Sequence, residues 1–311
     1  MTRIEVPGIS SPGTRFGFRR PRRQSATWPY LAPAVATLVA IGLFPLIQTF
    51  NLSFRSFSYI LPGRKGQWIG LENYQALLQD PSFLGAVGRT VVFTTSAVFL
   101  ELLVGLLLAA ALNITTSGRR LLVSLLIIPM ILTPVIIGLM FNFALNPLFG
   151  PLAQLIDALG IGRAEDILGT PFGAFTSLVL VDVWQWTPFM ALILWAGMQA
   201  LPTPPLEAAA VDGAGFFQRL RLVMLPMLRP VVVVAVIFRA SEAVREFDKV
   251  FVLTGGGPGS ATEVLDLFTY RTAFVNWDMS LGAAMGVVVF LAALTSAILF
   301  YAVVTRGGRE A

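Results

Sequence analysis

The chain has no cysteine and no histidine among its 311 residues, and its lysines are Lys65 and Lys249. These absences exclude disulfides, cysteine and histidine metal sites, and acid–base catalysis by an imidazole. Charged residues are also scarce, at 13% of the chain against 56% hydrophobic residues, and the mean hydropathy is +0.76. A water-soluble domain of this length needs more charge to cover its surface, so lipid is the expected solvent for much of the chain.

Six apolar runs are long enough to cross a membrane, since a hydrocarbon core of about 30 Å needs roughly 20 helical residues. We expect the first run to be a span and not a cleaved signal peptide, because it follows a long tail and lacks a clear cleavage site. The sequence therefore predicts an all-α membrane protein with six transmembrane helices, at approximately 28–50, 87–112, 121–145, 174–199, 229–252 and 282–304.

Arginines predict the orientation, because short basic loops stay in the cytoplasm. The N-terminal tail carries "RFGFRRPRR" (15–23), and alternate loops and the C-terminus are also rich in arginine. Both termini are expected in the cytoplasm, with tails 1–27 and 305–311 flanking a membrane domain at 28–304. The net charge of +5 is not arranged as a basic stripe with interleaved aromatic residues, so we expect no nucleic-acid partner.

One cytoplasmic stretch differs from the apolar runs around it, namely "EAAAVDGAGFFQRLRLVMLPMLRP" at 207–230. Its small residues predict a first helix, and Gly213 offers a turn because glycine tolerates positive φ. A second amphipathic helix follows, and we expect Pro226 to interrupt it. An Asp-Gly turn alone fits an amphipathic loop lying on the membrane surface, so the assignment of a function depends on the whole string.

The whole string resembles the cytoplasmic EAA loop of permease subunits in binding-protein-dependent ABC importers. The matching residues are Glu207-Ala208-Ala209, Gly213 and Leu225-Pro226. Leu220 departs from the family, which usually has phenylalanine there, and we expect this to change the packing at the ATPase contact and not the function. Further strings resemble carbohydrate-importer permeases of the maltose, glycerol-phosphate and trehalose type, and the resemblance covers about 28–304. These strings are "GLENYQALLQDPSF" (70–83), "IPMILTPVIIGLMFNFALNPLFG" (128–150), "VDVWQWTPFMALILWAGMQALP" (181–202) and "FDKVFVLTGGGPGSATEVL" (247–265).

This resemblance implies a type I ABC importer permease fold in a bacterial cytoplasmic (inner) membrane, crossed several times and surrounded by lipid. It implies a carbohydrate substrate, a second homologous permease, two ABC ATPase subunits and an extracytoplasmic solute-binding protein. The chain is not expected to be an enzyme, because neither lysine lies in a phosphate-binding loop; ATP and magnesium are expected on the ATPase subunits. A coupling loop at about 203–228 is expected to dock on the ATPase through Glu207, Ala208, Ala209, Asp212, Gly213, Leu225 and Pro226.

Ionisable residues inside apolar segments are costly and usually face a cavity or a partner. Arg239, Glu242, Glu246 and Lys249 are spaced to line one face of the fifth predicted helix, with Arg245 beside them. That face fits a water-filled path, or an ion-pair ladder that holds the helices together. By resemblance, Asp182 and Trp186 fall where a maltose-type permease contacts its sugar. The candidate path residues are Asp182, Trp186, Asn142, Glu242, Arg245 and Glu246.

Glu101 is isolated among apolar neighbours in the second predicted span, so we expect it to be paired or protonated in a structural role. Two other classes of function stay open at this point. An ion-coupled secondary transporter would use the charges of the fifth span and need no ATPase. A membrane-embedded enzyme would need a carboxylate pair such as Glu242 and Glu246, since histidine and cysteine are absent.

Overall fold

The computed structural model describes residues 28–59, 63, 65–115 and 117–307, so the predicted N-terminal tail and the end of the C-terminal tail lie outside the described residues. The described chain is mainly helical and forms two compact units, which divide after Ile47. The first unit carries α1 (Trp28–Leu38), a π-helical turn (Val39–Leu43) and the start of α2 (Phe44–Ser53). Its side chains are largely exposed, as expected for a helix that is surrounded by lipid or packs against a partner protein.

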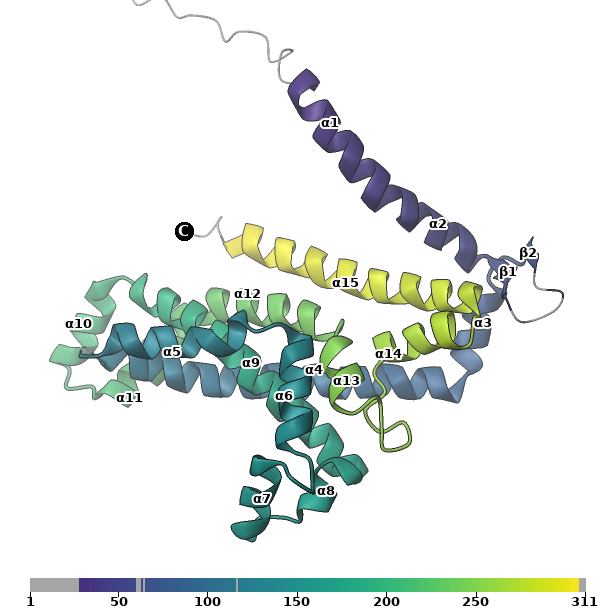
Figure 1. Ribbon diagram of the computed structural model, residues 1–311. Helices are drawn as coiled ribbons and strands as arrows, with labels where there is room; N and C mark the ends of the chain where they lie inside the picture. Colours follow the sequence, from purple (N-terminus) through teal and green to yellow (C-terminus); the bar gives the residue numbers. More distant parts are fainter. Residues whose placement is uncertain (1–27, 60–62, 64, 116, 308–311) are drawn as a thin grey trace, which may run out of the picture. The chain divides into compact units, whose positions relative to one another are not determined.

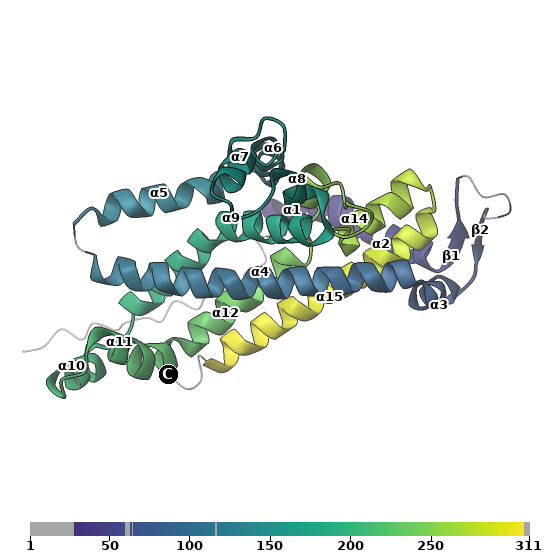
Figure 2. The ribbon, with the colours of Figure 1, turned by 90° about the horizontal axis from the view of Figure 1, so that it is seen from below.

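The second unit begins with the rest of α2, and a small β-hairpin follows. Its strands, β1 (Arg55–Phe57) and β2 (Lys65–Trp68), pair antiparallel with Arg55 opposite Trp68. A short helix, α3 (Glu72–Gln79), follows. Its buried Asn73 donates from Nδ2 to the carbonyl oxygens of Ser53 (2.7 Å) and Arg55 (2.8 Å). These bonds fix the hairpin against α3. Figures 1 and 2 both place the hairpin and α3 at the end of this unit opposite α10 and α11.

Two long helices, α4 (Pro81–Ile114) and α9 (Pro171–Gln199), pack along each other and carry much of the core. Each begins with a proline in its first turn after a capping residue, Asp80 for α4 and Thr170 for α9. Gly105 permits their close approach, because a Cβ there would lie 2.7 Å from the Cβ of Met190. The neighbouring buried positions are apolar, so α4 and α9 form a rigid base for the polar groups described below.

The third predicted span is two helices, α5 (Arg119–Ile131) and α6 (Pro134–Ala144), which meet at an angle of 94°. The bend follows from Pro134, which occupies the first turn of α6 and holds the preceding residues in an extended conformation. Two short helices, α7 (Pro151–Ala158) and α8 (Ala164–Gly169), then lead to α9.

The insert between the fourth and fifth predicted spans forms α10 (Thr203–Val211), α11 (Phe216–Arg219), a π-helical segment (Leu220–Met224) and α12 (Leu225–Ala243). The expectation that Pro226 interrupts the second helix was wrong, since the helix runs on from Phe216 to Ala243. Pro226 instead sits in the first turn of α12, directly after the π-helical segment. Proline is tolerated at that position, because it has no N–H to donate and the wider π-helical turn accommodates the missing hydrogen bond.

The prediction that the fifth span, 229–252, is a single helix was also wrong. The chain leaves α12 at Ala243, and a separate helix, α13 (Asp248–Leu253), begins beyond the break. Glu246 favours the break, because its carboxylate accepts the N–H of Lys249 (3.2 Å) as an N-terminal cap does. The charged residues of this region therefore do not line one continuous helical face.

The last described elements are α14 (Leu265–Tyr270), a π-helical turn (Arg271–Val275) and α15 (Met279–Gly307), which packs on α12. In the described residues, four helices are long and apolar enough to cross a membrane, and the bent pair α5–α6 brings the number to five. The apolar part of α15, Met279–Thr295, is shorter. The fold is thus a multi-helix membrane bundle, with α10 and α11 at one end (Figure 1).

Candidate functional site

The insert presents a short helix, α10, that ends in a Schellman motif. The N–H of Ala214 donates to the carbonyl of Ala209 (2.9 Å), and the N–H of Gly213 donates to that of Ala210 (3.1 Å). Gly213 has a φ of +81°, the left-handed conformation that this motif requires at the residue after the helix cap. The predicted turn at Gly213 is therefore confirmed.

The surface of this insert is rich in exposed small and apolar groups. Glu207, Ala208 and Asp212 are exposed, and Ala209 is half-buried. Val211 and Phe217, on the two sides of the turn, are 87% and 78% exposed. Large apolar side chains with so much exposure at adjacent helix ends are typical of a contact surface. Leu225 and Pro226 lie further along, at the start of α12, where Leu225 is half-buried and Pro226 exposed.

A second polar feature lies inside the helix bundle, where Arg239 of α12 meets acids from two other helices. Its Nε lies 2.9 Å from Glu101 Oε2 of α4, and its Nη2 contacts Asp182 Oδ2 of α9. All three side chains are at most 1% exposed. The contact with Glu101 is close but not aligned as a hydrogen bond, so Glu101 is held mainly by charge. The predicted pairing of Glu101 is confirmed.

Lys249 extends this cluster through α13. Its Nζ contacts Asp182 Oδ1 (2.6 Å), Glu246 Oε2 (2.8 Å) and the side-chain oxygen of Gln185 (2.8 Å). Gln185 in turn donates to the carbonyl of Leu132, at the bend between α5 and α6 (3.2 Å). We call these six side chains the buried ion network; its members are Glu101, Asp182, Gln185, Arg239, Glu246 and Lys249.

The buried ion network joins four helices by charge. Taking charges out of water is expensive, and their mutual attraction compensates only when each has good partners. Asp182 meets this condition because it bridges both cations, Arg239 and Lys249. Removing any single cation would leave a buried carboxylate uncompensated. The arrangement of α4, α9, α12 and α13 therefore depends on both cations, Arg239 and Lys249.

A polar cavity of about 220 Å³ lies beside the buried ion network. Glu242 and Arg245 pair at its edge (2.6 Å), with side chains 41% and 50% exposed. The Trp186 ring lies 5.0 Å below the Arg239 guanidinium, which orients the indole by a cation–π contact. The cavity thus offers carboxylates, cations and an aromatic face together. Its lining residues are Pro134, Trp186, Arg239, Glu242, Arg245, Glu246, Phe247, Asp248 and Lys249.

The structure brings four of the six candidate path residues to this cavity: Trp186, Glu242, Arg245 and Glu246. Asp182 lies behind them, fully buried and bound to both cations. Asn142 stands apart, where its amide donates to the carbonyl of Leu253 at the end of α13 (2.9 Å). Contact with solute thus stays a prediction for all six residues, and Asp182 and Asn142 also have a structural role.

The sequence did not predict that Arg239 and Lys249 share the carboxylate of Asp182. It also did not predict the contact between Gln185 and Lys249. A usable signal existed, because three acids and two bases in apolar segments each require a partner. The partners lie far apart in the chain, so helical spacing within one segment did not show them. Glu242 and Glu246, predicted on one face with Arg239 and Lys249, instead separate: Glu242 pairs with Arg245 and Glu246 with Lys249.

Asp266 at the start of α14, outside the spans, predicts a pH dependence of stability. Burial raises the pKa of its carboxyl from 3.8 to about 6, and Arg245 opposes this rise by a smaller amount. Between these two pH values the folded chain binds a proton that the unfolded chain has lost. The contribution of Asp266 to stability therefore falls as the pH rises through this window. Asp266→Asn is expected to raise the melting temperature above pH 6 and leave it unchanged below the window; equal shifts at all pH values would contradict this.

Residues 101–309 match the family described as binding-protein-dependent transport system inner membrane component. The chain belongs to this family. A permease of this kind lies in the inner membrane and crosses it several times, and it moves a solute without catalysing a reaction. The matched region contains the buried ion network, the polar cavity and the insert.

Individual relatives cover most of the chain. It is 35% identical to the probable ABC transporter permease protein y4oQ of Sinorhizobium fredii, over 91% of each chain. It is 34% identical to the trehalose/maltose transport system permease protein MalF of Thermococcus litoralis, over 87% of this chain and 90% of the relative. A chain of a bacterial alginate ABC transporter, solved with a periplasmic protein holding an alginate pentasaccharide, shares the fold with a TM-score of 0.75 at 18% identity. That match covers 89% of this chain and 93% of the other.

Proposed function

We propose that this permease is a transmembrane subunit of an ATP-driven, binding-protein-dependent sugar importer. The main support for this proposal is the polar cavity lined by Trp186, which places hydrogen-bonding groups and an aromatic face inside the apolar helix bundle of a member of this family. Carboxylates and guanidinium groups bind sugar hydroxyls, and an indole packs on the apolar face of a sugar ring. The relative in Thermococcus litoralis is named for trehalose and maltose, which supports a carbohydrate as the solute.

The proposed topology has six spans with both termini in the cytoplasm. Its membrane domain covers 28–304, between the tails 1–27 and 305–311, and α15 supplies the sixth span beside the five of the described helices and bent pair. The positions of the arginines support this orientation. In this topology the insert at about 203–228 faces the cytoplasm, and the hairpin and α3 lie outside.

The proposed assembly contains a second homologous permease, two ABC ATPase subunits and an extracytoplasmic solute-binding protein. The binding protein of the solved alginate transporter supports the last of these partners. We assign ATP and magnesium to the ATPase subunits, because this chain has no phosphate-binding loop. The exposed helix α10 and its glycine turn would dock on an ATPase through Glu207, Ala208, Ala209, Asp212, Gly213, Leu225 and Pro226.

In this mechanism the polar cavity forms part of the sugar path, and the buried ion network fixes its wall. Trp186, Glu242, Arg245 and Glu246 would contact the solute, while Asp182 and Asn142 would reach it only if their present bonds opened. Closure of the ATPase subunits would move α10, and the continuous helix from Phe216 to Ala243 would carry that movement to the cavity.

Trp186→Ala is expected to raise the solute concentration for half-maximal uptake by at least about tenfold, because stacking on a sugar and the orientation of Arg239 are both lost. Trp184→Ala is a matched control, since Trp184 is on the same helix but lies outside the cavity. Equal effects of the two substitutions, with both complexes assembled, would remove Trp186 from the path.

The proposed function is tested by reconstituting the purified complex in lipid vesicles with the binding protein. Trehalose and maltose are the first solutes to try. Uptake should require ATP at the cytoplasmic face and persist when an uncoupler removes ion gradients. An ion-coupled secondary transporter gives the reverse result. The structure adds an argument against that alternative, because Arg239 and Lys249, central charges of the fifth predicted span, are already bound to buried acids.

A further inference from the structure

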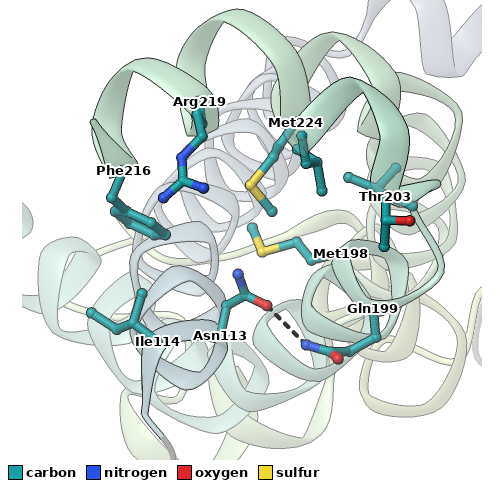
Figure 3. A pocket seen from close by; sticks show the side chains of 10 residues that line it. Asn113, Ile114, Met198, Gln199, Thr203, Phe216, Arg219 and Met224 are labelled. Atoms are coloured by element: carbon teal, nitrogen blue, oxygen red, sulfur yellow. Dashed lines mark hydrogen bonds between the residues drawn. The ribbon is translucent and has the colours of Figure 1, made fainter. Parts of the chain in front are cut away.

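A second pocket, of about 340 Å³, lies behind the cytoplasmic insert and is separate from the polar cavity. One wall is formed by the ends of α4 and α9, and the other by α10, α11 and the π-helical segment after α11 (Figure 3). A molecule in this pocket would contact both walls at once. Its ten lining residues are Asn113, Ile114, Met198, Gln199, Leu201, Thr203, Leu206, Phe216, Arg219 and Met224.

The polar groups of this pocket suit an anion. Its lining contains one cation, Arg219, and no carboxylate. Asn113 accepts a hydrogen bond from Gln199 through its side-chain oxygen (2.8 Å), which leaves the amide nitrogen of Asn113 to donate. Figure 3 shows this amide and the Arg219 guanidinium directed toward the interior of the pocket. Arg219 and the Asn113 amide nitrogen thus offer donors, as a bound anion requires.

Arg219 is the least satisfied polar side chain of this region. Its Nε is buried, yet it has no hydrogen-bond partner among the described residues. No ion pair of Arg219 occurs in the described part of the chain either, whereas Arg239, Arg245 and Arg271 each have a carboxylate. A buried donor without an acceptor is unfavourable, so Arg219 is expected to meet an acceptor that this chain does not supply.

We propose that this pocket binds a phosphate-bearing ligand, with phosphoryl oxygens on Arg219 and the Asn113 amide. A guanidinium binds phosphate through two parallel hydrogen bonds, and a further phosphate oxygen can accept a hydrogen bond from the Asn113 amide. The rest of the ligand would pack on Phe216, Met198 and Met224, which supply apolar and adaptable surface. The same chemistry occurs in the headgroup of an anionic phospholipid and in a soluble phosphate ester.

The position of the pocket gives this ligand a consequence for coupling. It lies between α10, which is proposed to dock on the ATPase, and the core helices α4 and α9. An occupant would tie the insert to these helices and stabilise one position of α10. The inference extends the proposed function, but ligand binding can be measured without transport, so each can fail without the other.

The test uses the purified complex containing the full chain and measures its melting temperature by tryptophan fluorescence. Glycerol 3-phosphate is titrated against sodium chloride at equal ionic strength. In parallel, bilayer discs of phosphatidylglycerol are compared with discs of phosphatidylcholine. Arg219→Gln and Asn113→Leu change the pocket, and Arg221→Gln is the matched control, since Arg221 is exposed and does not line it.

The proposal predicts stabilisation by at least one phosphate source in the unmodified complex and in Arg221→Gln. Arg219→Gln should raise the half-saturating concentration at least about tenfold, as expected for loss of a charged bidentate contact. Stabilisation by glycerol 3-phosphate indicates a soluble ligand, and stabilisation by phosphatidylglycerol alone indicates a lipid. No stabilisation above the controls, or equal stabilisation of Arg219→Gln, would overturn the proposal. So would loss of the ATPase subunit as the sole effect of Arg219→Gln, since Arg219 would then pair with a protein carboxylate.

Discussion

Arg239→Met is expected to lower the free energy of unfolding by about 3–5 kcal/mol, the loss typical when one partner of a buried ion pair is removed. Methionine replaces the aliphatic part of the arginine side chain and carries no charge, so Glu101 loses its cation and Asp182 keeps only Lys249. The measurement is a denaturant titration of the purified chain in detergent, followed by tryptophan fluorescence.

Two variants make this test specific to the buried ion network. Arg221→Met removes an exposed arginine and should change stability little. Adding Glu101→Leu to Arg239→Met removes the acid that has no other cation, so the double variant should recover part of the loss. Equal stability of Arg239→Met and the unmodified chain would show that the network does not hold the helices. Additive losses in the double variant would separate Glu101 from Arg239.

Gly213→Asp is expected to abolish uptake while the chain still inserts into the membrane. The cost within the chain is small, because no atom lies within 4 Å of the added Cβ and aspartate tolerates the left-handed conformation better than most residues. The side chain would instead project from the turn after α10, the surface proposed to approach the ATPase. Uptake should fall at least about tenfold, which corresponds to 1.4 kcal/mol of lost interaction. Uptake in cells and the amount of inserted chain are measured together.

Gly160→Asp is the matched control for this substitution. Gly160 also has a positive φ (+66°) and open space around the added Cβ, but it lies in the turn between α7 and α8. It should therefore show the backbone cost without the effect on docking. Normal uptake by Gly213→Asp would contradict the coupling role of α10, and an equal loss in both variants would point to backbone strain.

The sequence predicted the helical class, the apolar segments and the turn at Gly213, because each depends on residues close together in the chain. It did not predict the 94° bend before Pro134, since the length and hydropathy of a segment do not indicate the direction of its helix axis. It also missed the break at Ala243, where the carboxylate of Glu246 caps α13 and competes with continued helix.

The sequence identified the ionisable members of the buried ion network, but it predicted neither Gln185 nor the arrangement of the network. Charges in apolar segments identified Asp182, Glu101 and Arg239 as residues that need partners. Their pairing depends on how α4, α9 and α12 pack, which local spacing does not contain. The pocket at Arg219 escaped prediction for the same reason, because Asn113 at the end of α4 lies about a hundred residues before Arg219 in the chain.

The central claim, that this chain is one permease of a larger ATP-driven assembly, is tested most directly by purification. The chain is extracted from its native membrane in a mild detergent, and the proteins that copurify are identified by mass spectrometry. A second permease of the same family and an ATPase with a phosphate-binding loop are the predicted partners. Recovery of the chain alone, in a form that still transports solute after reconstitution without ATP, would contradict the claim.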